Sequence, residues 1–194
     1  MPLWTIVGSV LGTLVIVILV LNFRKPEKEP AHRVARHYNI VDPQLRREMS
    51  VLLGPAIVSG NRIESLQNGD QIFPAMLEAI RAAKRTITFE TYIYWSGDIG
   101  EQFAQALIER ARARVCVHVM LDWVGCDKIS QQLLSRMKDG GVEVERYHRV
   151  RWYTLGHLNN RTHRKVLIID GALGFTGGVG IADQWLGHAQ DAAH

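Results

Sequence analysis

The segment that decides the fold runs from Arg161 to Asp170 and reads Arg-Thr-His-Arg-Lys-Val-Leu-Ile-Ile-Asp. Its four consecutive apolar residues, 166–169, predict a buried β-strand. Side chains two positions apart lie on the same face of a strand, so His163 and Lys165 are expected to point the same way. The segment therefore predicts a histidine and a lysine held together at the start of a strand, with a carboxylate at its end.

This set of groups suits chemistry at a phosphorus atom. An imidazole can attack phosphorus and later leave as a nitrogen leaving group, which divides one difficult step into two. A lysine two residues away can stay on the phosphoryl oxygens and stabilise the charge in both steps. His163 and Lys165 are therefore the candidate catalytic residues, together with Asp170, which is expected to orient or electrostatically support the site.

The residues on either side of this segment suit a phosphate group. No acidic residue lies between positions 146 and 165, and the stretch holds Arg146, Arg149, Arg151, Arg161, Arg164 and Lys165. Thr176-Gly177-Gly178 follows, where missing side chains let backbone N–H groups approach a phosphate. Arg161, Gly177 and Gly178 are the candidate phosphate-binding residues.

The rest of the chain alternates between helical and strand periodicities. Strands are expected over 58–66, 86–95, 115–121, 142–147 and 166–169, and helices over 43–53, 73–80, 103–111 and 129–138. Within 86–95, Tyr92 and Tyr94 are expected on the face opposite Ile87 and Phe89. Strands that alternate with helices predict an α/β fold with a mostly parallel sheet covered on both faces.

The N-terminal segment Leu3–Phe23 predicts a single membrane-spanning helix. Its 21 residues carry no charged side chain, and a helix of that length, about 31 Å, matches a hydrocarbon core of roughly 30 Å. The length, together with the lack of a basic residue before it and of an Ala-x-Ala site after it, argues against a cleaved signal peptide.

Charge is concentrated just after this span. Residues 24–47, here called the basic collar, hold seven basic and three acidic residues, whereas residues 48–194 hold 16 of each. The positive-inside rule therefore predicts that the body lies in the cytoplasm at the cell membrane. The basic collar either attracts anionic lipid headgroups as well or serves only as this topology signal. Because the body is neutral overall, nucleic acid is not an expected partner.

Composition excludes several classes of protein. With 194 residues, 47% hydrophobic, 22% charged and two cysteines, the chain is not disordered, collagen-like or a disulfide scaffold. The length beyond the span leaves room for one domain of ordinary size. Cys116, inside a predicted strand, is expected to be a small core residue.

The pattern His163-x-Lys165-x4-Asp170-x6-Gly177-Gly178 resembles the motif of the phospholipase D superfamily. The wider sequence resembles a bacterial cardiolipin synthase in Gly60-Asn61, Asn68-Gly69, Glu90-Thr-Tyr-Ile-Tyr94, Asp98-Ile-Gly100 and Leu121-Asp-Trp-Val-Gly125. This resemblance implies a phospholipase D-like α-β-α sandwich, of which the chain holds one half with one motif. The implied domains are a transmembrane anchor over 1–23, a basic juxtamembrane linker with a short amphipathic helix over 24–57, and a catalytic domain, expected to be truncated, over 58–194.

The resemblance also implies an activity. In such synthases phosphatidylglycerol donates its phosphatidyl group, through a phosphohistidine, to a hydroxyl of a second phosphatidylglycerol, giving cardiolipin and glycerol. His163 would be the nucleophile or the general acid for the leaving alcohol, Lys165 would bind the phosphoryl oxygens, and Asp170 would support the motif. No metal or organic cofactor is implied. The carboxylate that commonly orients the family's histidine from downstream could here be only Asp183 or Asp191.

Two departures from the family pattern bear on function. Gly180 occupies the position of the family's asparagine, which removes a polar contact near the phosphate. No second His-x-Lys pair is present, although the superfamily's active site needs two facing motifs. The second motif is expected from a missing C-terminal half or from a second copy. Two alternatives stay open: a homodimeric phosphodiesterase that hydrolyses phospholipid or nucleic acid, and an inactive lipid-binding fragment.

Overall fold

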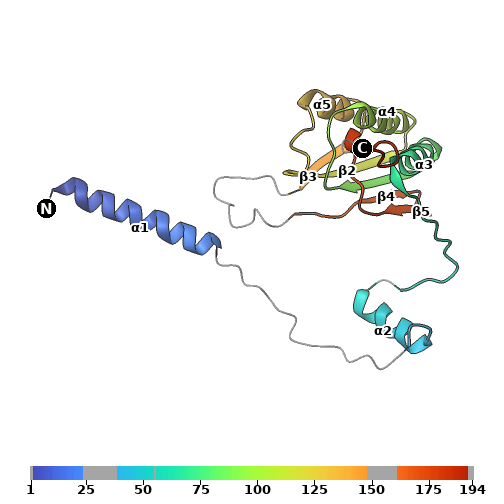
Figure 1. Cartoon of the computed structure of the whole chain (residues 1–194), viewed down its shortest axis with the longest axis horizontal. Coiled ribbons are helices and arrows are strands. Elements are labelled where there is room, and N and C mark those ends of the chain that lie inside the picture. The colour runs from blue at the N-terminus through green and yellow to red at the C-terminus, as the bar shows by residue number, and fades with distance from the viewer. Residues whose placement is uncertain (1, 24–38, 55, 148–160, 192–194) are drawn as a thin grey trace. The chain divides into compact units, whose positions relative to one another are not determined.

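The computed structural model describes residues 2–23, 39–54, 56–147 and 161–191. The chain comprises an N-terminal helix, a segment within Arg24–Ser65 that contains a short helix, and an α/β body that begins at Leu66 (Figure 1).

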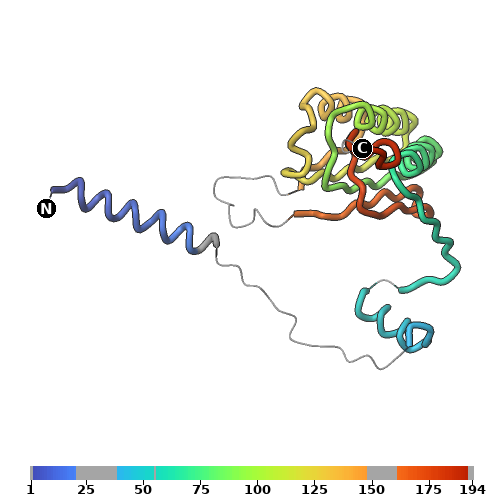
Figure 2. Tube along the Cα trace, in the orientation of Figure 1, coloured from blue at the N-terminus to red at the C-terminus, as the bar shows by residue number. Residues whose placement is uncertain are grey.

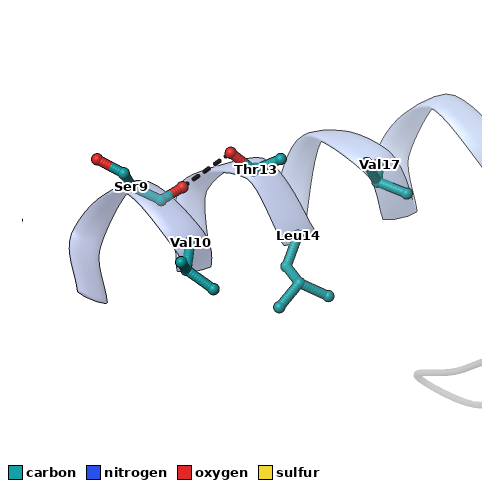
Figure 3. A pocket seen from close by; sticks show the side chains of 5 residues that line it. All are labelled: Ser9, Val10, Thr13, Leu14 and Val17. Carbon is teal, nitrogen blue, oxygen red and sulfur yellow. Dashed lines mark hydrogen bonds between the residues drawn. The ribbon is translucent and has the colours of Figure 1, made fainter. Parts of the chain in front are cut away.

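Helix α1 spans Leu3–Phe23, as the apolar run predicts. Its stretch Leu3–Val20 has a mean hydropathy of 2.5 and no buried residue, so it is long and apolar enough to be a candidate membrane span. The hydroxyls of Ser9 and Thr13 each donate a 2.8 Å hydrogen bond to a carbonyl oxygen one turn earlier. Figure 3 shows the bond from Thr13 to the Ser9 carbonyl. Hydroxyls satisfied in this way need no water, as a hydrocarbon environment requires. The shallow groove on this helix is lined by Ser9, Val10, Thr13, Leu14 and Val17 and carries no ionisable group.

Helix α2 spans Pro43–Leu53, as predicted, and none of its residues is buried. Asp42 caps it by accepting a 2.8 Å hydrogen bond from the Gln44 amide. The strand expected over 58–66 is a wrong prediction, because these residues are neither helix nor strand and Ile63 is 93% exposed. A strand needs a neighbour for its backbone groups, and within the described residues none borders this segment.

The body is built on a five-stranded sheet with the strand order β3-β2-β1-β4-β5. The strands are β1 (Thr86–Thr91), β2 (Cys116–Asp122), β3 (Glu143–Tyr147), β4 (Val166–Ile169) and β5 (Leu173–Thr176). The first three are parallel, as the alternation with helices predicts. In contrast, β4 and β5 join antiparallel, so the sheet is mixed rather than mostly parallel. As a result, the carboxyl ends of β1 and β2 and the amino end of β4 share one edge.

Three helices, α3 (Asn68–Ala82), α4 (Asp98–Arg112) and α5 (Gln131–Asp139), cover one face of this sheet (Figure 1). Apolar side chains alternate along the strands, so that one side of each strand faces these helices. The core between sheet and helices has an aromatic centre in which the Phe103 ring lies 6.0 Å from the rings of both Phe73 and Phe89, centroid to centroid.

No helix in the described ranges covers the opposite face of the sheet. His118 and Met120 are exposed there, and His118 Nδ1 lies 2.9 Å from Glu143 Oε2 on the neighbouring strand. Cys116, expected in the core, is exposed on this face because the alternation turns Val117 inward instead. The predicted α/β class is confirmed, and the residues described form one of the two expected helical layers.

The alternation of β1 ends at Thr91, which changes the place of Tyr94. Tyr94 is fully buried, and its hydroxyl donates a 2.7 Å hydrogen bond to the Gly100 carbonyl. Sequence periodicity instead predicts Tyr94 beside Tyr92 on the other face of the strand. The chain leaves the strand path here because Ile181, from the C-terminal segment, accepts a 2.9 Å hydrogen bond from the Trp95 amide. Figure 2 shows this C-terminal segment returning past the helical layer of the body.

Candidate active site

His163 and Lys165 lie just before β4, at the sheet edge where β1 and β2 end. Both side chains face the ring of Tyr92. The His163 and Tyr92 ring centroids are 4.9 Å apart, and Lys165 Nζ is 5.7 Å from the centroid of the Tyr92 ring, within the range of a cation–π interaction. His163 is exposed and Lys165 is half-buried. The structure therefore brings together the two side chains that their spacing predicts on one face.

The residue before His163 is held by two carboxylates. The Thr162 amide donates a 3.2 Å hydrogen bond to Asp122 Oδ2, and the Thr162 hydroxyl donates to Glu90 Oε1. Glu90 lies near the carboxyl end of β1, and Asp122 ends β2. Side chains from two neighbouring parallel strands thus hold Thr162, the residue directly before His163.

The second oxygen of Asp122 closes the turn that follows β2. Asp122 Oδ1 accepts hydrogen bonds of 2.9 and 3.0 Å from the amides of Val124 and Gly125. Arg161 Nη1 lies 3.5 Å from the same oxygen, and the side chains of Arg161 and Asp122 are 13% and 0% exposed. A buried carboxylate requires such a compensating charge. In the structure, Arg161, a candidate phosphate-binding residue, therefore forms an ion pair with Asp122.

This turn also supports Tyr92. A Cβ at Gly125 would lie 2.1 Å from the Tyr92 carbonyl oxygen, so only glycine allows the two backbones to approach so closely. Cys126 Sγ donates to the same carbonyl at 3.3 Å. Burial raises the pKa of the Cys126 thiol to about 12, which keeps it neutral and unreactive near pH 7.

Arg146 is likewise engaged within the protein. Its guanidinium lies 3.9 Å from the Trp123 ring centroid, and Nη2 donates to the carbonyls of Trp123 and Cys126 at 3.3 and 3.5 Å. Of the other arginines in the predicted phosphate-attracting stretch, Arg164 is exposed, whereas Arg149 and Arg151 lie outside the described residues.

Asp170 lies at the other end of β4, five residues and on the order of 16 Å from Lys165 along an extended strand. Its carboxylate accepts hydrogen bonds of 2.9, 2.9 and 2.7 Å from the amides of Thr86, Lys84 and Arg85. These bonds, led by that of Thr86, lower the pKa of the Asp170 carboxyl. The structure therefore places Asp170 at the start of β1 and does not bring it to the histidine–lysine pair that it was expected to support.

Asp170 also makes the turn between β4 and β5. Asp170 and Gly171 have φ angles of 52° and 68°, and the Ala172 amide donates to the Ile169 carbonyl at 3.0 Å. Positive φ at both central residues is the signature of a type I′ hairpin turn, for which Asp-Gly is a preferred sequence.

The hairpin returns Gly177 and Gly178 to the edge where His163 lies, because Val166 pairs with Thr176. A Cβ at Gly177 or Gly178 would meet nothing within 4 Å, so the space beside them is open. At Gly180, by contrast, a Cβ would lie 2.8 Å from Ile93 Cβ and 2.9 Å from Trp185 Cζ3. Close packing therefore accounts for glycine at the family's asparagine position.

Asp183, one of the two downstream carboxylates that could orient His163, instead binds the first amides of helix α4. It accepts hydrogen bonds of 3.0 and 2.9 Å from the amides of Asp98 and Ile99 at the start of α4, where a negative charge stabilises the helix. Within the described ranges, no cluster of three or more histidine, cysteine or carboxylate side chains could hold a metal ion.

Nuc from Salmonella typhimurium, a phospholipase D family member, matches with a TM-score of 0.47 and 18% identity, over 60% of this chain and 68% of its own.

Sequence relatives match more extensively. Cardiolipin synthase 1 of Bacillus anthracis is 38% identical over 126 residues, which are 64% of this chain and 25% of that protein. Cardiolipin synthase A of Pseudomonas fluorescens is 31% identical over 131 residues, 67% of this chain and 27% of that protein. The chain thus spans about a quarter of the length of these relatives. The family profile described as "Cardiolipin synthase, PLD-like domain" matches residues 76–193, more than half of the chain. The chain therefore belongs to the phospholipase D-like domain family of the cardiolipin synthases.

Proposed function

We propose that this chain supplies one half of the active site of a phosphatidyltransferase that makes cardiolipin from two phosphatidylglycerol molecules. The observation that carries the proposal is the exposed His163 imidazole beside Lys165, both against Tyr92, in a chain of this family. The His163 imidazole is exposed and so accessible to substrate, and the cation of Lys165 lies two residues away.

The proposed reaction has two displacements at one phosphorus atom. In the first, a histidine nitrogen bonds to phosphorus of the donor lipid, the bond to the glycerol headgroup oxygen breaks, and that oxygen takes a proton from a second histidine. In the second, a hydroxyl of another phosphatidylglycerol attacks, gives its proton back to the second histidine, and the phosphorus–nitrogen bond breaks. Lys165 stays on the non-bridging oxygens throughout.

His163 fills one of these two histidine roles. The other belongs to a second His-x-Lys motif, which comes from a C-terminal half or, in the reconstituted chain tested below, from a second copy of this chain. His163 is exposed where β1 and β2 end, as a residue that meets a facing motif has to be.

Membrane attachment supports a lipid substrate. Helix α1 is long and apolar enough to be a candidate membrane span. The proposed arrangement is a single pass by α1 with the body in the cytoplasm, since the basic collar follows the span. The net charge of +4 over residues 24–47 favours anionic headgroups such as phosphatidylglycerol.

The test is product analysis with the full chain reconstituted in vesicles of radiolabelled phosphatidylglycerol. We expect cardiolipin and glycerol from the wild type, lost in His163→Ala and kept in His118→Ala, because His118 lies exposed on the opposite face of the sheet. Phosphatidic acid in place of cardiolipin would identify water as the acceptor. Vesicle binding without either product would contradict transfer by this chain.

A further inference from the structure

Thr162, Glu90 and Asp122 form a cluster, here called the Thr162 clamp, directly before the candidate nucleophile. Its members come from distant parts of the sequence, because Thr162 lies 72 residues from Glu90 and 40 from Asp122. Thr162 and Asp122 are buried, and Glu90 is half-buried. None of the three carries chemistry in the reaction proposed above.

The clamp holds Thr162 from two directions. Glu90 accepts a hydrogen bond from its hydroxyl, and Asp122 accepts one from its amide. The two carboxylates stand at the ends of neighbouring parallel strands, because Glu90 is in register with Met120 and Asp122 lies two residues farther along β2. The sheet therefore fixes the distance between them, and a residue bonded to both has little freedom to move.

The same Asp122 carboxylate also bonds to the turn that supports Tyr92. Its Oδ1 closes the turn that contains Gly125, and the Gly125 backbone packs against the Tyr92 carbonyl. One side chain thus ties the His163 backbone to the turn that supports the Tyr92 ring, against which His163 and Lys165 lie.

We propose that Glu90 and Asp122 are positioning residues that act through Thr162 to hold the His163 imidazole against Tyr92 in the orientation needed at phosphorus. The inference rests on the proposed function, because it assigns a purpose to the orientation of His163. Neither carboxylate contacts the reacting atoms. A displacement of about 1 Å at a reacting group can lower a rate by on the order of 100-fold, so this clamp is expected to act on kcat rather than on KM.

The test compares Thr162→Val, which removes the hydroxyl at nearly constant shape, with Thr162→Ser, which keeps it. We expect kcat for cardiolipin formation to fall roughly 10- to 100-fold in Thr162→Val, with KM unchanged, and to stay within about 3-fold in Thr162→Ser. Glu90→Ala should cause the same loss. Combined with Thr162→Val it should add nothing further, as expected for two groups that act through one contact.

A second measurement needs no turnover. The imidazole signals of the full chain, labelled with ¹⁵N-histidine in detergent micelles, are recorded by NMR, and His163 is assigned from its absence in His163→Gln. We expect the His163 signals to shift or broaden in Thr162→Val and Glu90→Ala, and to match the wild type in Thr162→Ser, while His118 stays constant in all of them.

The two measurements separate this inference from the proposed function. If the wild-type chain makes no cardiolipin, the proposed transfer by two copies of this chain fails, and the histidine spectrum still tests the clamp. If Thr162→Val does not fold by circular dichroism, Glu90→Ala takes its place in both measurements. Unchanged His163 signals in a folded Thr162→Val or Glu90→Ala chain, or losses of kcat that multiply in the double variant, would overturn the proposal.

Discussion

Restoring the family's asparagine at position 180 should destabilise this protein. A Cβ at Gly180 would lie 2.8 Å from Ile93 Cβ and 2.9 Å from Trp185 Cζ3, whereas carbon atoms in contact are normally about 3.5–4.0 Å apart. Neither neighbour is the free end of a flexible chain, so both must shift by about 1 Å. Overpacking of this kind costs about 1–3 kcal/mol, which corresponds to a fall in melting temperature of about 4–12 °C for a body of this size.

The assay is thermal unfolding of the full chain in detergent micelles, followed by circular dichroism, for Gly180→Asn and for the matched control Gly178→Asn. A Cβ at Gly178 meets nothing within 4 Å, and neither glycine has a positive φ. The control should therefore melt within about 2 °C of the wild type. If Gly180→Asn melted as the control does, close packing would not be the reason for glycine at this position.

Asp170→Asn is expected to remove a pH-dependent part of the stability: the low pKa of Asp170 favours the folded chain above the unfolded value of about 3.9. That contribution is lost as the pH falls through the folded-state pKa, so urea unfolding should show a gap between variant and wild type at pH 7 that closes in acid. Arg161→Ala leaves the buried Asp122 charge uncompensated and should cost about 3 kcal/mol, measured by the same unfolding, whereas Arg164→Ala, at an exposed position, should cost less than about 0.5 kcal/mol. Lys165→Ala should lower the rate of cardiolipin formation about 100-fold or more, with Lys165→Arg retaining more of it; equal rates for both variants would contradict a role for the charge.

Local patterns were sufficient to predict the helices and most of the strands. The helix over 43–53 matches α2, and the strand over 166–169 matches β4, because amphipathic spacing and apolar runs report burial directly. The predicted strand over 58–66 has the composition of a strand but no neighbour. Pairing depends on distant residues, which periodicity within one segment does not contain.

In the site as well, features within one short segment can be predicted from the sequence, whereas contacts between distant residues cannot. The common orientation of His163 and Lys165 follows from strand geometry alone. Asp170-Gly171, a preferred type I′ pair, indicates the hairpin turn, whereas the motif predicts the same Asp170 carboxylate in the active site. The Thr162 clamp could not be predicted from local sequence patterns. Its contacts join residues 72 and 40 positions apart, which only the order of strands in the sheet brings together.

The most direct test of the central claim is the rate of cardiolipin formation by His163→Ala relative to the wild type, per folded molecule, in phosphatidylglycerol vesicles. If the His163–Lys165 pair acts at phosphorus, the rate should fall at least about 100-fold, while His118→Ala keeps the wild-type rate. A His163→Ala chain that makes cardiolipin at the wild-type rate would contradict the account.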